Sequence, residues 1–433
     1  MENIKNVAFS AVEALKARGA QHAAVSASFS ETKEFNVDGG EFSLFRTLFD
    51  NELTLTAVKD GKKGSIGVNH FDEETINSAA DNCIASAEAS EADYNWEFGP
   101  DAGRHSFVDG SIEPDMNLFF LRCRELVETI KTDFPKIIVE QLIASHNTLS
   151  KVYTNTNGSL FERKSGYYQL MIMFSGHENG KGSSFFGTGF TTCDLSKAFI
   201  EQASLKRDLA DVEKQIYTVP VSGKFEGTIL LPPGCLGNVL YYGLNNFANG
   251  NAVNAGTSLW KDKLGETVAD ERLTITLAPR SDEIVCGDRW TGDGYLCEDF
   301  DLIKDGKLNS FIMDKYFSNK TGFERSGNYS VGNMIIPAGN TSLSEIISGI
   351  ERGLLVGRIS GGNPSSSGDF SMVAKNSFII EKGKIGDAVS EVMINGNLAE
   401  LFKNIRDISI EKEPDGSGSL PWIAFDGVTI SGK

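Results

Sequence analysis

The first hundred residues switch between a helical and a strand-like pattern of apolar positions. Ile4, Val7, Ala11 and Leu15 recur at helical spacing, which predicts an amphipathic helix at the start of the chain. Residues 73–89 repeat that pattern. Between the two helices, alternating segments bounded by Gly-containing turns predict strands over residues 23–30, 34–37, 42–49 and 52–59. The order helix, strands, helix indicates an α+β fold with an antiparallel sheet.

The rest of the chain continues the alternation and becomes richer in short strands. We expect three parts: an N-terminal α+β domain over 1–108, a middle α+β region over 109–220 and a β-rich domain over 221–433. The middle region is predicted to hold helices over 115–132 and 195–209 and strands over 137–146, 151–156, 160–174 and 183–192. In the last region a helix with one apolar stripe follows a strand over 225–231 and Pro232-Pro233-Gly234. Beyond it we predict strands over 273–277, 300–304, 311–316, 377–381 and 385–392, and helices over 342–353 and 397–406.

The composition narrows the choice of partners. The chain has 41 Lys and Arg against 59 Asp and Glu, a net charge of −18, so we expect no nucleic-acid partner. It contains no apolar run of about eighteen residues, and its first helix is amphipathic, so we expect neither a membrane span nor an export signal. The six cysteines are scattered without a CxxC pair, which predicts free thiols and a cytoplasmic protein.

Several phrases in the last region carry a resemblance to a known family. The most specific block runs Ser360-Gly361-Gly362-Asn363 and then Ser367-Gly368-Asp369-Phe370-Ser371. Gly256-Thr257-Ser258, Ser326-Gly327-Asn328 and Gly396-Asn397-Leu398 extend it. With these phrases the chain resembles the TldD/PmbA metallopeptidase family, modulator of DNA gyrase type, almost end to end. The resemblance implies an N-terminal α+β portion and a β-rich C-terminal domain around one central helix.

Metal-bearing members of that family have HExxxH in the helix that follows Pro232, and a third ligand cysteine near the C-terminus. In this sequence Tyr241 and Asn246 stand at the histidine positions, Tyr242 at the glutamate position and Asp415 at the cysteine position. Neutral phenol and amide oxygens are poor zinc ligands, and a phenol is a weak base at neutral pH. The chain therefore resembles the zinc-less, PmbA (TldE)-like members, and we expect no catalytic and no metal-binding residue in it.

The resemblance also implies partners and a substrate class. Metal-bearing members resemble zinc proteases that cut extended peptides, and they pair with a zinc-less sister subunit. The family is linked with peptide-antibiotic maturation and gyrase modulation. We therefore expect zinc in a TldD-like catalytic partner, a peptide substrate, and no activity of this chain alone. A heterodimer with that partner and a homodimer both stay open. The alternative function is a stand-alone peptide-binding or scaffold homodimer without peptidase activity.

Two groups of residues are candidates for a peptide groove. Tyr241, Tyr242, Asn245 and Asn246 are placed to pair with an extended peptide backbone, or else form a polar helix face bonded to neighbouring strands. Gly361-Gly362-Asn363 is either a loop that admits close backbone approach or a plain turn.

Other chemistries find less support in the sequence. A rebuilt metal site would draw on Cys235, Cys286, Cys297 and Asp415, whereas the plainer interpretation is thiols of the core and loops. His177-Glu178 lies in a Gly-rich turn, where we expect a solvated loop. The absence of histidine after His177 excludes a Ser-His-Asp triad in the last region.

Overall fold

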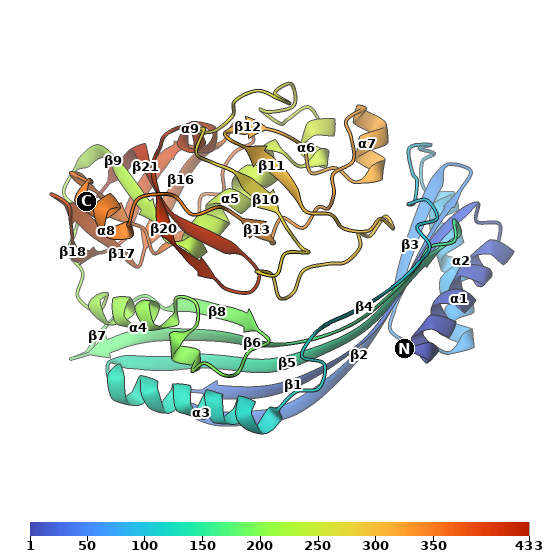
Figure 1. Ribbon diagram of the computed structural model, residues 1–433, viewed down its shortest axis with the longest axis horizontal. Coiled ribbons are helices and arrows are strands. Elements are labelled where there is room, and N and C mark those ends of the chain that lie inside the picture. The colour runs from blue at the N-terminus through green and yellow to red at the C-terminus, as the bar shows by residue number, and fades with distance from the viewer. Residues whose placement is uncertain (433) are drawn as a thin grey trace.

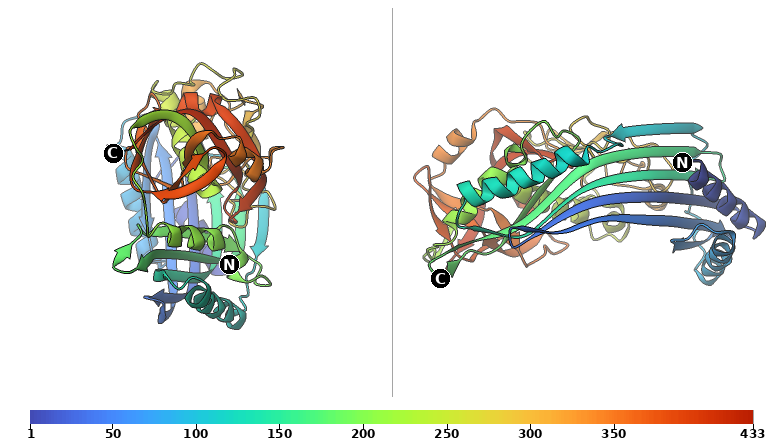
Figure 2. Two further views of the ribbon diagram at one scale, coloured as in Figure 1. Left: turned by 90° about the vertical axis from the view of Figure 1, so that its left-hand side faces the viewer. Right: turned by 90° about the horizontal axis from the view of Figure 1, so that it is seen from below.

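The structure, a computed structural model, describes residues 1–432. A long curved sheet forms the N-terminal half, and a β-rich domain lies over its concave side (Figure 1). The end-on and underside views show the same two layers (Figure 2). The two chain ends lie at opposite ends of the molecule in Figure 1.

The N-terminal sheet has eight strands, ordered β3-β2-β1-β5-β6-β4, with β7 and β8 also paired to β6. All pairs are antiparallel except β4 with β6, which is parallel. The strands are β1 (His22–Asp38), β2 (Glu41–Lys59), β3 (Lys62–Val68), β4 (Arg104–Gly110), β5 (Ile137–Asn155), β6 (Leu160–Glu178), β7 (Lys181–Gly182) and β8 (Phe186–Thr192).

Two groups of helices cover this sheet. Helices α1 (Glu2–Ala17) and α2 (Glu73–Ala89) pack against one end, where small residues such as Ala8 and Ala11 meet Leu53 and Leu55. Nearer the other end lie α3 (Met116–Asp133), the 3-10 turn η1 (Phe199–Glu201) and α4 (Leu205–Lys214), which share one core with β5 and β6. Side-chain caps fix two helix starts, because Asp72 accepts from the Thr75 amide and Asp115 from the Leu118 amide.

Three long strands replace pairs of predicted shorter ones. Residues 23–30 and 34–37 belong to one strand, β1, and the same holds for 42–49 with 52–59 in β2 and for 137–146 with 151–156 in β5. The predicted breaks are wrong because tertiary pairing overrides the polar stretches. Residues 31–33, for example, pair with β2 on one side and β5 on the other. Their side chains stay half-exposed while the backbone remains extended.

The C-terminal sheet has thirteen strands. Its main order is β12-β11-β10-β13-β21-β9-β14-β17-β18, with β15, β16, β19 and β20 attached to it. The strands are β9 (Lys224–Leu231), β10 (Ile275–Leu277), β11 (Phe300–Lys304), β12 (Lys307–Leu308), β13 (Met334–Ile335), β14 (Arg352–Leu355), β15 (Arg358–Ser360), β16 (Asp369–Lys375), β17 (Ser377–Glu381), β18 (Lys384–Val389), β19 (Val392–Asn397), β20 (Ile405–Pro414) and β21 (Ser419–Ser431). The helices are α5 (Pro233–Phe247), α6 (Gly250–Asn254), α7 (Lys315–Thr321), α8 (Leu343–Ser348) and α9 (Leu398–Lys403).

Helix α5 is the central element of this domain. Its apolar stripe is buried in the largest core cluster, together with Trp260 and Phe402. The helix has glycine at 243 because Phe402 packs against it there, so that a Cβ would lie 2.5 Å from the Phe402 ring. The domain is therefore built around one helix, as expected.

Several other segments differ from their predicted structure. Ser390 and Glu391 divide the strand predicted over 385–392 into β18 and β19, and the helix predicted over 342–353 ends at Ser348, before β14. Residues 311–316 do not form a strand, because Asp314 accepts a hydrogen bond from the Phe317 amide at 2.7 Å and starts α7. The helix predicted over 195–209 begins only at Leu205, after η1.

The fold class predicted from the sequence is confirmed: α+β, with an antiparallel N-terminal sheet carrying helices and a β-rich C-terminal domain around a central helix. Strands from regions 1–108 and 109–220 share one sheet, and residue 108 lies within β4. Within residues 1–432, no helix is both long and apolar enough to cross a membrane.

Candidate functional site

Helix α5 carries Tyr241, Tyr242, Asn245 and Asn246, which belong to the segment that the resemblance relates to HExxxH. Tyr241 is 52% exposed, and Tyr242 is half-buried against the domain core. Asn245 donates to the Tyr241 carbonyl at 2.8 Å, a bond within the helix. Asn246 donates to the Ser365 carbonyl at 3.1 Å and so ties α5 to the loop between β15 and β16.

That loop contains Gly361, Gly362 and Asn363, all exposed. Gly361 and Gly362 adopt φ values of +67° and +62°. A Cβ on Gly362 would lie 1.7 Å from the Ser371 carbonyl oxygen, so this position requires glycine for both conformation and space. The structure thus brings Asn246 next to the loop that the sequence singled out.

Asp415 lies in the turn between β20 and β21 and faces the N-terminal sheet. Its Oδ1 accepts hydrogen bonds from the Ser417 amide, the Ser417 hydroxyl and the Gly418 amide at 2.7–2.8 Å. Its carbonyl accepts from the Thr191 amide of β8 at 2.7 Å. Within residues 1–432, no hydrogen bond joins Asp415 to Tyr241, Tyr242 or Asn246.

These four residues do not fit the zinc ion that the family implies for its metal-bearing members. Of the four, only Asp415 has a side chain that zinc commonly takes as a ligand, and its Oδ1 already satisfies a turn. In the described part of the chain, no three His, Cys, Asp or Glu side chains are grouped to hold a metal ion.

The rebuilt metal site drawn from cysteines is not brought together either. Cys235 is fully buried at the start of α5, and burial raises the pKa of its thiol to about 12. Cys286 lies near Asp415, whereas Cys297 is buried elsewhere. His177 and Glu178 are the last two residues of β6 and not, as was predicted, part of a loop, because they pair with β7. The His177 Nε2 is 2.9 Å from the Ser175 hydroxyl.

Two cavities lie between β8 and the C-terminal domain. The first, of about 270 Å³, is walled by β8, α4, the start of α5 and the loops around Arg358 and Asn376. The second, of about 600 Å³, follows β6 and β8 and has Met171 and Met173 among its lining residues. Both are lined by Gly187, Thr188, Gly189 and Asp415, so they adjoin along β8.

Strand β8 presents a free backbone edge to these cavities. Its other edge pairs with β6, and the Thr191 amide points away from β6 toward Asp415. Alternate residues of an antiparallel strand direct their N–H and C=O groups to the same edge. The backbone groups of Gly187 and Gly189 therefore share the edge of Thr191, and nothing within residues 1–432 bonds to them there. An extended peptide fits such an edge by strand addition.

The sequence predicted a strand at β8 but no role for it. The signal that was overlooked is Gly187-Thr188-Gly189, since glycine inside a strand marks close approach of a ligand or another backbone. Arg358 and Asn376 were also missed, because Arg358 begins β15, Asn376 lies between β16 and β17, and the two meet only in the folded domain.

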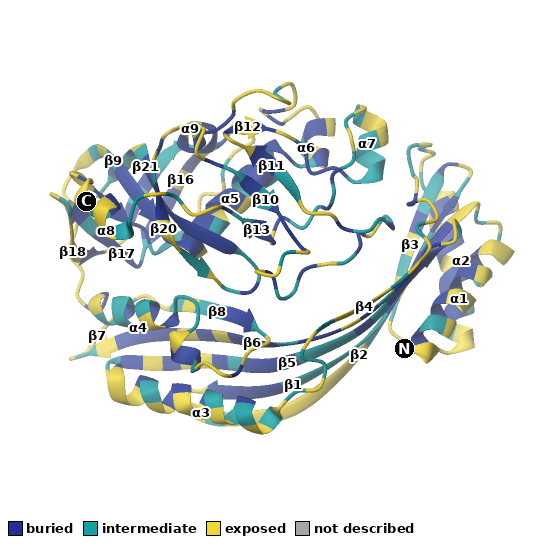
Figure 3. Cartoon of the chain, viewed as in Figure 1, coloured by how far each residue is buried: buried dark blue, intermediate teal, exposed yellow. Residues whose placement is uncertain are grey.

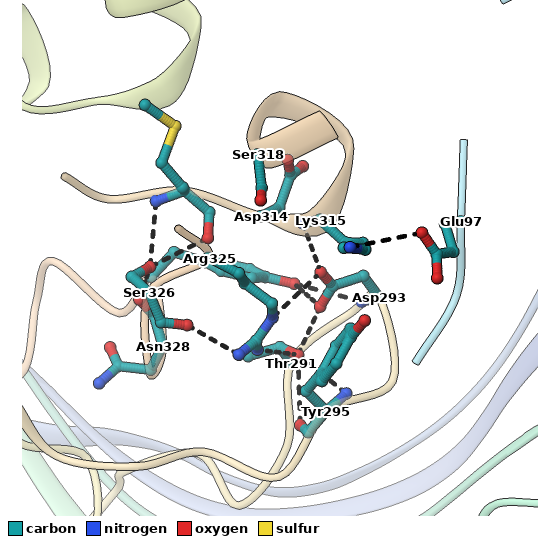
Figure 4. Close-up of polar contacts among 12 residues, drawn as sticks. Glu97, Thr291, Asp293, Tyr295, Asp314, Lys315, Ser318, Arg325, Ser326 and Asn328 are labelled. Carbon is teal, nitrogen blue, oxygen red and sulfur yellow. Dashed lines mark hydrogen bonds and ion pairs between the residues drawn. The ribbon is translucent and has the colours of Figure 1, made fainter. Parts of the chain in front are cut away.

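A polar network around Arg325 joins the two halves of the molecule (Figure 4). Arg325 donates to the Ser326 carbonyl at 2.7 Å and to the Thr291 hydroxyl at 3.1 Å, and its Nε lies 3.5 Å from Asp293 Oδ2. The Lys315 ammonium pairs with Glu97 in the segment after α2 at 3.4 Å. This network holds α7 against the N-terminal half.

The Ser326-Gly327-Asn328 phrase has a structural role in that network. The buried Ser326 hydroxyl donates to the Asn328 carbonyl at 2.6 Å, and Asn328 Nδ2 donates to the carbonyls of Leu277 and Glu298 at 3.0 and 2.8 Å. The phrase therefore fixes loops of the C-terminal domain.

We expect Gly416→Ala to destabilise the protein by about 1–3 kcal/mol. Gly416 has φ +82°, and a Cβ would lie 1.9 Å from the Thr191 carbonyl oxygen, so the turn would be forced away from β8. Urea unfolding measures the change. Gly361→Ala is the control, because Gly361 also has positive φ but open space around it. Equal losses in the two variants would show that contact with β8 contributes nothing.

The fold is thus α+β with a central helix α5, and Tyr241, Tyr242 and Asn246 on that helix are poor zinc ligands. Residues 222–432 match the family model of the PmbA/TldA metallopeptidase C-terminal domain. A metalloprotease PmbA homolog of Buchnera aphidicola is 24% identical over 417 residues, 93% of this chain and 89% of the relative. A metalloprotease of Methanothermobacter thermautotrophicus is 26% identical over 274 residues, and the match spans only 59% of each chain.

Two solved structures share the fold over the whole chain. TldE of Thermococcus kodakarensis superposes with a TM-score of 0.83 at 19% identity, covering 99% of this chain and 100% of that one. A candidate modulator of DNA gyrase from Bacteroides thetaiotaomicron superposes with a TM-score of 0.86 at 22% identity, covering 99% of both chains. Residues 222–432 thus belong to the PmbA/TldA metallopeptidase C-terminal domain family, and similarity to a PmbA homolog extends over 93% of the chain.

Proposed function

We propose that this chain is the zinc-less subunit of a cytoplasmic TldD/PmbA-type metallopeptidase that cleaves small or unfolded peptides. A sister subunit with HExxxH supplies the metal and the chemistry, and this chain completes the chamber that holds the peptide. The proposal rests on the residues at the positions where metal-bearing members are expected to bind zinc. Tyr241, Tyr242 and Asn246 are poor ligands, and Asp415 serves as a turn cap.

A second feature supports association with another chain. Strand β2 pairs with β3 only from Leu53 onward, so the outer edge of residues 41–52 has no strand partner within residues 1–432. Figure 3 shows that this stretch is exposed. Its exposed large apolar side chains are Leu44, Phe45, Leu48 and Phe49. A long apolar edge left open is prone to aggregate, which favours its being covered by another subunit.

Metal content and activity together test the proposal. We expect untagged protein to contain no stoichiometric zinc by elemental mass spectrometry, and to cleave unstructured peptides only when mixed with its HExxxH sister. Zinc-dependent cleavage by the chain alone would contradict the proposal.

The alternative, a stand-alone peptide-binding homodimer, predicts a different result when the chain is mixed with the sister subunit. It requires a stable dimer by light scattering that neither exchanges subunits with the sister nor changes the sister's activity. A pair of variants tests the proposed interface on β2. Leu48→Lys should weaken binding to the sister subunit, whereas the control Leu121→Lys, on the exposed face of α3, should not.

A further inference from the structure

One corner of the first cavity is positively charged, because its arginine has no carboxylate partner. Arg358 lines it and forms no ion pair with any carboxylate among residues 1–432. Its guanidinium donates only to neutral oxygens, those of Asn376 Oδ1 and the Ser184 hydroxyl, both at a long 3.4 Å. Burial lowers the pKa of Arg358, and no neighbouring charge offsets it. An arginine in this setting still has donors to offer to a ligand.

Asn376 adds a second unsatisfied donor to the same wall. It lines the cavity, is only 7% exposed, and its Nδ2 has no hydrogen-bond partner. Because its Oδ1 accepts from Arg358, the amide is oriented with the Nδ2 donor free. Buried polar groups in native proteins are nearly always bonded, so a free one beside a cavity indicates a missing partner.

The start of helix α5 supplies a third element. Pro233, Gly234 and Cys235 line the cavity, and the helix has no side-chain cap. The amides of Gly234 and Cys235 have no acceptor within residues 1–432. The N-terminus of a helix of this length carries partial positive charge and free N–H groups, which favours an anion.

The acidic residues that line the cavity already have partners of their own. Asp208 and Glu413 both bond to Arg207, and Asp211 pairs with Lys214 at 2.8 Å. Asp415 is satisfied by its own turn. They therefore do not neutralise the corner formed by Arg358, Asn376 and the start of α5, which we call the cationic corner.

We propose that the cationic corner binds a carboxylate of an extended peptide lying along β8. The free edge of β8 runs from the second cavity into the first, so a peptide paired with Gly187 and Gly189 is led toward Arg358. The carboxylate comes either from the peptide's C-terminus or from an acidic side chain near it. The inference uses the peptide-binding part of the proposed function but requires neither the sister subunit nor zinc.

Peptide binding to the full-length chain alone tests this inference. Three fluorescent versions of one short apolar peptide are titrated by polarisation: free acid, C-terminal amide, and amide ending in aspartate. We expect the free acid to bind about tenfold more tightly than the plain amide, which corresponds to about 1.4 kcal/mol. Recovery of affinity in the aspartate-ended amide would assign the carboxylate to side chains, and no recovery would assign it to the chain terminus.

Two arginine variants make the test specific. Arg358→Met should abolish the difference in affinity between the free acid and the amide, by lowering the affinity for the free acid. Arg352→Met is the matched control, since Arg352 lies on β14 over Phe225 and outside the cavity. Thermal unfolding checks that both variants fold, and Arg358→Lys, which retains the charge, should keep part of the preference.

Equal affinity for all three peptides, no binding of any, or an unchanged preference in Arg358→Met would each overturn the inference. None of these outcomes bears on zinc content or on activity with the sister subunit. Failure here is therefore distinguishable from failure of the proposed function.

Discussion

Replacing Arg207 with methionine is expected to destabilise the protein by about 3–5 kcal/mol. Arg207 lies on α4 between two carboxylates, bonding to the neighbouring Asp208 and across the domain boundary to Glu413. Asp208 is 7% exposed, and the side chain of Glu413 is 21% exposed. Methionine has similar length but no charge, so the variant would leave two carboxylates without their shared counter-ion.

The pH dependence of this loss identifies its cause. Burial raises the pKa of both Asp208 and Glu413 above the usual carboxyl value, although Arg207 opposes the shift. Groups with a raised folded pKa contribute stability that is present below their unfolded pKa of about 4 and lost as pH rises through the folded value. Without Arg207 both pKa values should rise further. The destabilisation should therefore be largest near pH 7.5 and shrink toward about pH 5, as urea unfolding at both values would show.

Lys206→Met is the matched control for this variant. Lys206 is the preceding residue on α4, and its pair with Glu201 is well exposed, so its removal should change stability by less than about 1 kcal/mol. A loss in Arg207→Met that stays constant from pH 5 to pH 7.5 would contradict the account, because it would point to lost packing against Trp422 instead.

The sequence was sufficient for the fold class because local patterns decide helix starts and strand alternation. Helix α2 and strands β11 and β17 have the bounds that were predicted from the pattern of apolar positions. The long strands were not predictable, since residues 31–33 look like a break until β2 and β5 are seen on either side. Propensity is local, whereas sheet pairing joins distant segments.

In the candidate site too, local features were predictable from the sequence, whereas contacts between distant segments were not. Substitution at the metal positions can be read from one helix, so Tyr241, Tyr242 and Asn246 were found. The cavity walls come from β8, α4, α5 and β15, which are far apart in the sequence, between residues 186 and 360. No short motif records that Arg358 and Asn376 line the same cavity as the start of α5, because these residues come together only when the C-terminal domain folds.

Asp109→Asn is expected to destabilise the protein by about 3 kcal/mol. Here the charges are reversed relative to Arg207, because one carboxylate lies between two guanidinium groups. Asp109, on β4, lies between Arg163 of β6 at 2.7 Å and Arg289 of the C-terminal domain at 2.6 Å. The side chains of Asp109 and Arg163 are only 14% and 8% exposed. Asparagine keeps the shape but removes the charge, which leaves two guanidinium groups facing each other without a carboxylate.

The charge clusters around Arg207 and Asp109 differ in the pH range over which they stabilise the protein. Burial acts to raise the pKa of Asp109, but the two guanidinium groups outweigh it and hold that pKa below the usual range. A depressed folded pKa contributes stability that is present above about pH 4 and is lost as pH falls through the folded value. The loss in Asp109→Asn should thus persist at pH 5, where that of Arg207→Met has already shrunk, and fade only below about pH 4. Glu128→Ala, from an exposed pair on α3, is the control and should change little at any pH. If the loss of stability in Arg207→Met and in Asp109→Asn disappeared over the same pH range, this account would be wrong. General acid unfolding, and not these two charge clusters, would then determine the pH dependence.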